Sequence, residues 1–120
     1  MRVLVVDDNR ANVEYFVDAL EAAGHVVAVE RDGEAGRARA LAEDFDLILL
    51  DIQLPRMSGD AVCRSLREAG LSLPIVALTS AAMPDQISRG AKAGFDAYLT
   101  KPITPAALRE AARRFGPRSA

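Results

Sequence analysis

Short apolar runs alternate along the chain with longer segments in which apolar residues recur every three or four positions. An unbroken run such as residues 47–50 is typical of a strand that is buried on both faces of a parallel sheet. Positions such as Val13, Phe16 and Leu20 instead form one apolar face of a helix. The pattern predicts strands over residues 3–6, 26–29, 47–50, 74–78 and 97–99, and helices between residues 9 and 24 and over residues 34–43, 59–69, 84–93 and 104–115.

Two of the predicted helices have weak apolar faces. In segment 34–43 the face consists of Ala38, Leu41 and Ala42. Segment 84–93 contains Gly90 and few large apolar residues, so we expect it to be the helix least anchored to the core. The alternation of strands and helices predicts an α/β fold in which a parallel sheet is covered on both faces and joined by right-handed crossovers. We expect one domain over residues 1–116, with a flexible tail over residues 117–120.

Composition excludes several classes of protein. With 120 residues, 50% hydrophobic and 27% charged, the chain has the profile of one soluble globular domain. Its formal net charge of -2 gives no general attraction to nucleic acid or to an anionic membrane. The single cysteine, Cys63, excludes an intramolecular disulfide. Neither a signal peptide nor a membrane-spanning run is visible, so we expect a cytoplasmic protein that binds neither a membrane nor DNA directly.

Acidic, hydroxyl and basic side chains follow the predicted strands. Because the carboxyl ends of parallel strands lie along one edge of the sheet, we expect them to converge there. They are Asp7, Asp8, Asp51, Thr79 and Lys101. Two carboxylates at 4 Å repel by about 1 kcal/mol in water and about 4 kcal/mol at an effective dielectric of 20, so a positive charge should lie between them. Lys101 is one candidate, and a hard cation such as Mg²⁺, or Mn²⁺ in its place, is the other.

A carboxylate, a divalent cation, a hydroxyl and an ammonium together are suited to phosphoryl transfer. Asp51 could simply cap a turn, but the other polar residues expected at the same edge of the sheet favour a reactive role. A carboxylate can act as the nucleophile and form an acyl phosphate without a catalytic base. The cation and Lys101 would neutralise the phosphoryl oxygens, and Thr79 would donate a hydrogen bond to one of them. His25 lies at the start of a strand, at the opposite edge of the sheet, so the sequence does not favour it as a phosphodonor.

These residues resemble the receiver domain of two-component response regulators. The resemblance rests on Asp7-Asp8, on Asp51 with Pro55 and Gly59 downstream, and on Thr79 and Lys101-Pro102, and it covers essentially the whole chain. It implies a flavodoxin-like (βα)5 three-layer sandwich with a five-stranded parallel sheet of order 2-1-3-4-5. The stretches at residues 8–12, 51–55 and 101–103 are also similar to stand-alone regulators of the DivK type and to the receivers of hybrid kinases.

The resemblance also implies a role for each matched position. Asp51 would be the phosphoacceptor, and Thr79 and Lys101 would bind the phosphoryl group. The Mg²⁺ ligands would be Asp8, Asp51 and the backbone carbonyl of Gln53, with Asp7 binding mainly through water. Thr79 and Tyr98 would form a switch, and the Lys101–Pro102 peptide bond would be cis. Gln53 and Ala81 occupy positions that vary in the family and that bear on the lifetime of the phosphoryl group.

The sequence therefore predicts a phosphoacceptor switch rather than an enzyme with turnover. A histidine kinase or a histidine phosphotransfer protein would supply the phosphoryl group, and a target protein would bind through residues 84–114. One alternative is an aspartyl-nucleophile phosphohydrolase, but such enzymes commonly have a second acid two residues after the nucleophile, where this chain has Gln53. Another is an FMN carrier, which would need a Gly/Ser/Thr-rich phosphate loop in place of Asp7-Asp8.

Overall fold

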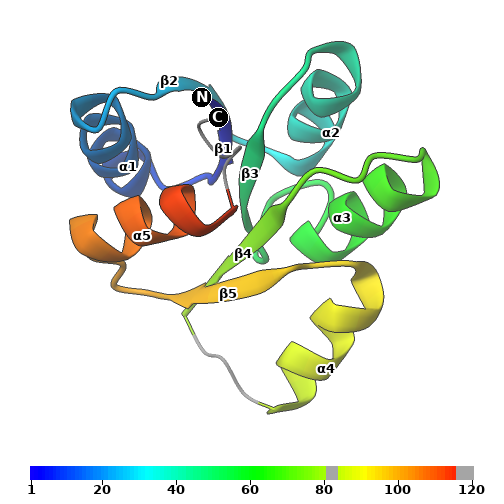
Figure 1. Cartoon of the computed structure of the whole chain (residues 1–120). Helices are drawn as coiled ribbons and strands as arrows, with labels where there is room; N and C mark the ends of the chain where they lie inside the picture. The colour runs from blue at the N-terminus through cyan, green and yellow to red at the C-terminus, as the bar shows by residue number, and fades with distance from the viewer. Residues whose placement is uncertain (81–83, 116–120) are drawn as a thin grey trace.

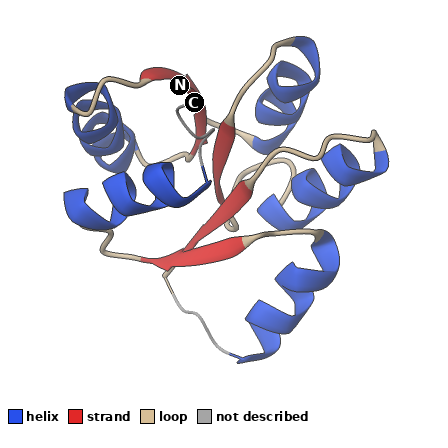
Figure 2. Cartoon of the chain, viewed as in Figure 1, coloured by secondary structure: helices blue, strands red, loops and turns tan. Residues whose placement is uncertain are grey.

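The computed structural model describes residues 1–80 and 84–115, and within them five strands alternate with five helices (Figure 1; Figure 2). The strands are β1 (Arg2–Val6), β2 (Val26–Glu30), β3 (Leu47–Asp51), β4 (Ile75–Thr79) and β5 (Ala97–Thr100). The helices are α1 (Arg10–Ala22), α2 (Gly33–Ala42), α3 (Gly59–Glu68), α4 (Pro84–Ala93) and α5 (Pro105–Phe115). The predicted tail, residues 117–120, lies outside the described residues.

The five strands form one parallel sheet in the order β2-β1-β3-β4-β5. Helices α1 and α5 cover one face, and α2, α3 and α4 cover the other (Figure 1). The predicted flavodoxin-like fold and its strand order are confirmed. Strand β3 lies at the centre of the sheet and is buried along its whole length, as its unbroken apolar run predicts. In the part of the chain that the structure describes, no helix has the length and apolar character needed to cross a membrane.

The two faces of the sheet have separate cores. Beneath α1 and α5, the large side chains of Phe16, Leu20 and Leu108 pack against residues of β1, β3 and β4. On the other face, α3 contributes Val62, Cys63 and Leu66 in its predicted orientation. Side chains alternate along each strand, so every buried strand supplies both cores.

Helix α2 does not use the apolar face that its sequence predicts. The residues predicted to face inward are all exposed: Ala38, Leu41 and Ala42. The helix instead packs through Gly36 and Ala40, and a Cβ added to Gly36 would lie only 2.9 Å from both methyl carbons of Val6. A glycine here lets the helix backbone approach the sheet closely, which turns the helix away from the orientation that its larger apolar residues favour.

The residues that directly follow α4 are attached to α3 and β4 by an arginine. On α3, the Arg67 guanidinium donates two hydrogen bonds to the Gly94 carbonyl, at 3.0 and 2.9 Å, and one to Asp96 Oδ2 at 2.9 Å. Asp96 Oδ2 also accepts a hydrogen bond of 2.8 Å from the backbone N–H of Ile75, at the start of β4. The C-terminal end of α4 is therefore fixed in place.

Candidate functional site

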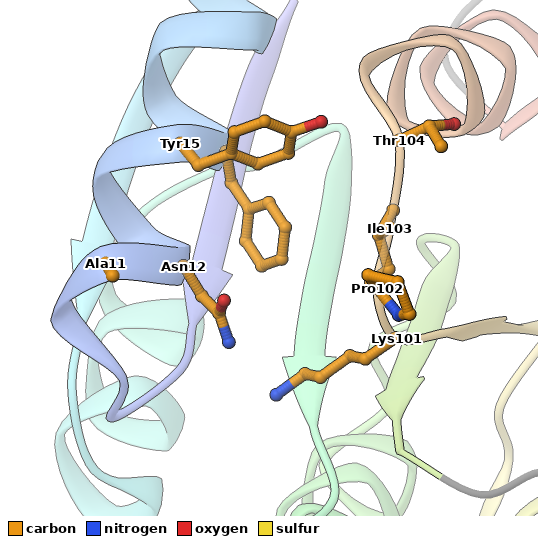
Figure 3. Close-up of a pocket in the computed structure, with 8 residues that line it drawn as sticks. Ala11, Asn12, Tyr15, Lys101, Pro102, Ile103 and Thr104 are labelled. Carbon is orange, nitrogen blue, oxygen red and sulfur yellow. The ribbon is translucent and has the colours of Figure 1, made fainter.

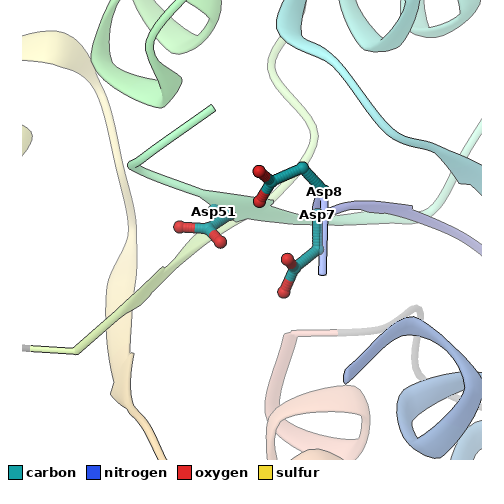
Figure 4. Close-up of side chains that lie close together, drawn as sticks. All are labelled: Asp7, Asp8 and Asp51. Carbon is teal, nitrogen blue, oxygen red and sulfur yellow. The ribbon is translucent and has the colours of Figure 1, made fainter. Parts of the chain in front are cut away.

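Three aspartates meet at the carboxyl ends of β1 and β3. Asp7 and Asp8 follow β1, and Asp51 is the last residue of β3, which pairs directly with β1. Each contributes a carboxylate oxygen to a group whose atoms all lie within 4.8 Å of one another (Figure 4). Asp7 is 0% exposed and Asp51 4% exposed, whereas Asp8 is open to solvent. The convergence expected from the ends of the strands is present.

Lys101 extends from the end of β5 into this group. Its Nζ lies 2.7 Å from Asp51 Oδ2 and 3.4 Å from Asp7 Oδ2. The Lys101 backbone N–H donates a 2.7 Å hydrogen bond to the Thr79 carbonyl, and the Lys101–Pro102 peptide bond is cis. Burial alone lowers the pKa of the Lys101 ammonium, but the hydrogen bond and charge of Asp51 and the charge of Asp7 raise it above its usual value. Lys101 is therefore a fixed positive charge.

The surroundings of Asp51 shift the pKa of its carboxyl in opposite directions. Burial raises the pKa of this carboxyl above its ordinary value, although hydrogen bonds from Lys101 Nζ and from the Gln53 N–H at 3.0 Å favour the charged form. The negative charge of Asp7 adds to the upward shift of the Asp51 pKa. A further positive charge at the cluster would relieve this repulsion.

Asp7 supplies a buried oxygen that suits a cation. Its Oδ1 accepts a 2.9 Å hydrogen bond from the Asn9 N–H. Its Oδ2 is buried and makes no hydrogen bond within the described residues, with only the Lys101 ammonium at ion-pair distance. A buried oxygen without a hydrogen bond is costly in a folded protein. An all-oxygen group of this kind, with no nitrogen or sulfur ligand, matches the preference of Mg²⁺.

The loop after Asp51 depends on a glycine. Gly59 is the first residue of α3, and its N–H donates a 2.9 Å hydrogen bond to the Ile52 carbonyl. A Cβ at Gly59 would overlap the Asp51 backbone carbonyl. The sequence predicted Gly59 as the end of a loop and the start of a helix, without a contact to Asp51. Its close approach to the backbone of Asp51 follows from the fold, and it lets α3 begin directly against that backbone.

Thr79 and Tyr98 lie near the cluster on neighbouring strands. Thr79 is the last residue of β4 and is buried, and β4 pairs with β3 so that Leu78 lies opposite Asp51. Tyr98 on β5 lies opposite Ala77, two residues before Thr79. Its hydroxyl donates a 3.0 Å hydrogen bond to the Ile87 carbonyl in α4. Ala81, at the variable position named above, lies outside the described residues.

A pocket opens beside Lys101, between α1 and the segment that leads into α5. Its volume is about 420 Å³, within the range of about 300–1,000 Å³ that is common for ligand pockets. Figure 3 shows Asn12 and Tyr15 on α1 across the pocket from Lys101 and Thr104. The sequence did not reveal this pocket, because its two walls are almost ninety positions apart along the chain.

The sequence matches the family model described as the response regulator receiver domain over residues 3–113. The chain belongs to this family. It is a receiver domain of two-component signal transduction, and the resemblance inferred from its strand-end residues is confirmed.

Several curated relatives of this receiver domain are transcriptional regulators. The transcriptional regulatory protein CusR of Escherichia coli K12 is 38% identical over 90% of this chain and 48% of its own length. The alkaline phosphatase synthesis regulator PhoP of Bacillus subtilis is 38% identical over 87% of this chain and 43% of its own length. The chain thus spans about half the length of the curated relatives it matches.

Solved structures confirm the fold of the receiver domain. The chemotaxis protein CheY4 of Vibrio cholerae superposes with a TM-score of 0.89 at 29% identity, over 95% of this chain and 97% of its own. The receiver domain of the sensor histidine kinase PA1611 of Pseudomonas aeruginosa, solved with a coordinated magnesium ion, gives a TM-score of 0.87 at 32% identity over 95% of each chain. Because a chemotaxis regulator and a kinase receiver both match, the narrower resemblance to DivK-type or hybrid-kinase receivers stays a prediction.

Proposed function

We propose that this receiver domain accepts a phosphoryl group on Asp51 and then changes its affinity for a partner protein. The observation that carries the proposal is the position of Lys101, whose Nζ lies 2.7 Å from Asp51 Oδ2 and 3.4 Å from Asp7 Oδ2. Phosphorylation adds about 1.5 to 2 negative charges at neutral pH, and a fixed ammonium at this place would stabilise them.

The proposed donor is a phosphohistidine on a histidine kinase or a histidine phosphotransfer protein. One Asp51 carboxylate oxygen bonds to phosphorus while the P–N bond of the donor breaks, and the electron pair of that bond stays on the imidazole nitrogen. The product is an acyl phosphate on Asp51. Lys101 and the Thr79 hydroxyl would bind its phosphoryl oxygens. The chemistry is limited to self-phosphorylation and autodephosphorylation, so the domain is a phosphoacceptor and not an enzyme with turnover.

The pocket beside Lys101 supports an approach of the donor along α1. Its wall includes the partly exposed ring of Tyr15, the amide of Asn12 and the side chain of Thr104. A histidine side chain entering between α1 and the residue 101–104 segment would reach the cluster next to the Lys101 ammonium. We propose that the donor protein covers this pocket during transfer.

We propose that Mg²⁺ binds at the aspartate cluster, with Mn²⁺ as a substitute. Asp8, Asp51 and the backbone carbonyl of Gln53 would hold it, and Asp7 would bind it mainly through water. The buried Asp7 Oδ2 without a hydrogen bond and the all-oxygen donor set support this assignment, as does the magnesium ion of the PA1611 receiver structure. When bound, the cation would neutralise charge on the phosphoryl oxygens during transfer.

Output would pass by protein contact through residues 84–114. Thr79 would bond to the phosphoryl group, and Tyr98 would then move toward the space that Thr79 leaves. The curated relatives are named as transcriptional regulators, but we propose that this receiver domain itself contacts protein and not DNA, because its formal net charge is -2. We also propose a cytoplasmic location, where histidine kinases present their phosphodonor.

The experiment is to incubate the protein with acetyl phosphate and Mg²⁺ and to measure its intact mass. We expect one phosphoryl adduct in the wild type and none in Asp51→Asn. Asp18→Asn, an exposed aspartate on α1, is the matched control and should be modified like the wild type. An adduct that persists in Asp51→Asn would show that another residue is the acceptor. Steady release of phosphate from a phosphomonoester, which cannot serve as the donor for self-phosphorylation, would instead support the phosphohydrolase.

A further inference from the structure

Tyr98 has a defined position between β5 and the middle of α4. Its hydroxyl donates a 3.0 Å hydrogen bond to the Ile87 carbonyl, and its ring lies 5.9 Å from the ring of Phe95, centroid to centroid. The ring is partly buried and packs against the core on the face of the sheet that α2, α3 and α4 cover. The hydroxyl therefore bonds to the backbone of α4 rather than reaching only solvent.

Gly90 has no side chain, and this leaves room for the Tyr98 ring. A Cβ at Gly90 would overlap the Tyr98 hydroxyl and would lie 2.6 Å from Cζ and 3.0 Å from Cε1 of the same ring. Glycine inside a helix costs about 0.5–1 kcal/mol relative to alanine. Gly90 is in the interior of α4 and is buried. Helix propensity thus disfavours glycine at this position, whereas the approach of Tyr98 requires it.

The hydrogen bond from Tyr98 complements the anchor at the other end of the helix. Arg67 fixes the residues after α4 through Gly94 and Asp96. The bond to Ile87 is made one turn into α4, near the end that follows β4 and Thr79. A change at Thr79 can therefore reach α4 through Tyr98, while the far end of the helix stays in place.

We propose that Gly90 is a positioning residue, which sets where the Tyr98 ring lies before Asp51 is phosphorylated. Through this position it determines how much free energy phosphorylation must supply to switch the domain. This inference rests on the proposed function of Asp51. For Tyr98 to move toward Thr79, its hydrogen bond to Ile87 must break and its ring must leave the space beside Gly90. A side chain at position 90 fills that space in advance. The resting state then loses its hydrogen bond, and the switched state becomes easier to populate.

The test uses beryllofluoride as the phosphoryl mimic, with Mg²⁺, on protein labelled with fluorotyrosine. The chain has two tyrosines, Tyr15 and Tyr98, and the Tyr15→Phe variant assigns the two fluorine resonances. We expect Gly90→Ala to shift the Tyr98 resonance before any mimic is added. We also expect it to lower the half-saturating beryllofluoride concentration about fivefold, which corresponds to one hydrogen bond of about 1 kcal/mol. Ser88→Ala, an exposed position on α4, should change neither quantity.

A double variant separates this role from a general effect on the helix. In a Tyr98→Ala background, Gly90→Ala should raise thermal stability through helix propensity but should leave beryllofluoride affinity unchanged. An affinity gain of equal size in both backgrounds would overturn the inference, since Tyr98 would not be involved. Unchanged affinity in the single Gly90→Ala variant would also overturn it while the wild type still binds the mimic. A wild type that does not bind beryllofluoride would instead contradict the proposed function itself.

Discussion

Helices α1 and α5 on one face of the sheet are packed differently from α4 on the other. Phe16, Leu20 and Leu108 are each at most 2% exposed and interdigitate with the sheet. Among the described side chains of α4, the largest apolar one is Ile87, and it is 39% exposed. The middle of α4 rests on Gly90 and on one tyrosine hydroxyl. The first face is a fixed support, whereas α4 can shift without opening a large cavity.

This difference suits a switch. Interlocking core side chains cannot be displaced by small amounts, because they are close-packed. A helix held by small residues and a hydrogen bond can adopt a second position at low cost in free energy. The proposed reaction occurs at the edge that both regions share. The face covered by α1 and α5 would then keep the aspartates in place, and α4, which is packed less tightly, would move in response to phosphorylation.

The largest expected effect comes from shortening a large buried side chain on the face covered by α1 and α5. Leu108→Ala in α5 should lower the free energy of unfolding by about 2–5 kcal/mol, because it leaves a cavity beneath the helix. Ile87→Ala in α4 should change it by only about 0.5 kcal/mol. Urea denaturation of both variants measures this contrast. Equal losses would show that α4 is packed as firmly as α5, and the comparison between the two faces would then be wrong.

Much of this arrangement could be predicted from the sequence. Unbroken apolar runs identify the strands, and the rule that parallel strands end at one edge brings Asp7, Asp51 and Lys101 together. The exposure of Ile87 also agrees with the expectation that segment 84–93 is the least anchored helix.

The contacts that the sequence could not predict depend on glycines and on distant pairs. Apolar periodicity gives no weight to a glycine, so it assigned the wrong inner face to α2, which packs through Gly36. The same limitation concealed the approach of Tyr98 to Gly90. Arg67 has the pattern of a solvated helix residue, yet it bonds to Gly94 and Asp96, 27 and 29 positions away. Such contacts become visible only when the helices have been placed in space.

A metal titration tests the region next to α1, because Asp8 lies between β1 and α1. If Mg²⁺ binds the folded state alone, a concentration ten times its Kd should add about 1.4 kcal/mol to the free energy of unfolding. Asp8→Ala should lose most of this gain, since it removes a proposed ligand. Thermal unfolding with Mg²⁺ and with a chelator measures the effect, and Asp18→Ala is the matched control. An equal response of Asp8→Ala and the control would argue against a metal site at the cluster.

The last prediction concerns the link between the two regions. Moving a population from 1:99 to 99:1 takes about 5.5 kcal/mol, and a hydrogen bond to a charged group supplies about 1.5–3 kcal/mol of it. Thr79→Ala should therefore weaken the response to beryllofluoride without abolishing it, and Thr79→Ser, which keeps a hydroxyl, should retain most of it. Backbone amide chemical shifts, measured by NMR with and without beryllofluoride, report the size of this response. In the wild type, shifts should concentrate in residues 84–100 and stay small in α1 and the buried turns of α5. If α4 is silent in the wild type, or responds equally in Thr79→Ala, the signal leaves the domain by another route than Thr79 and Tyr98.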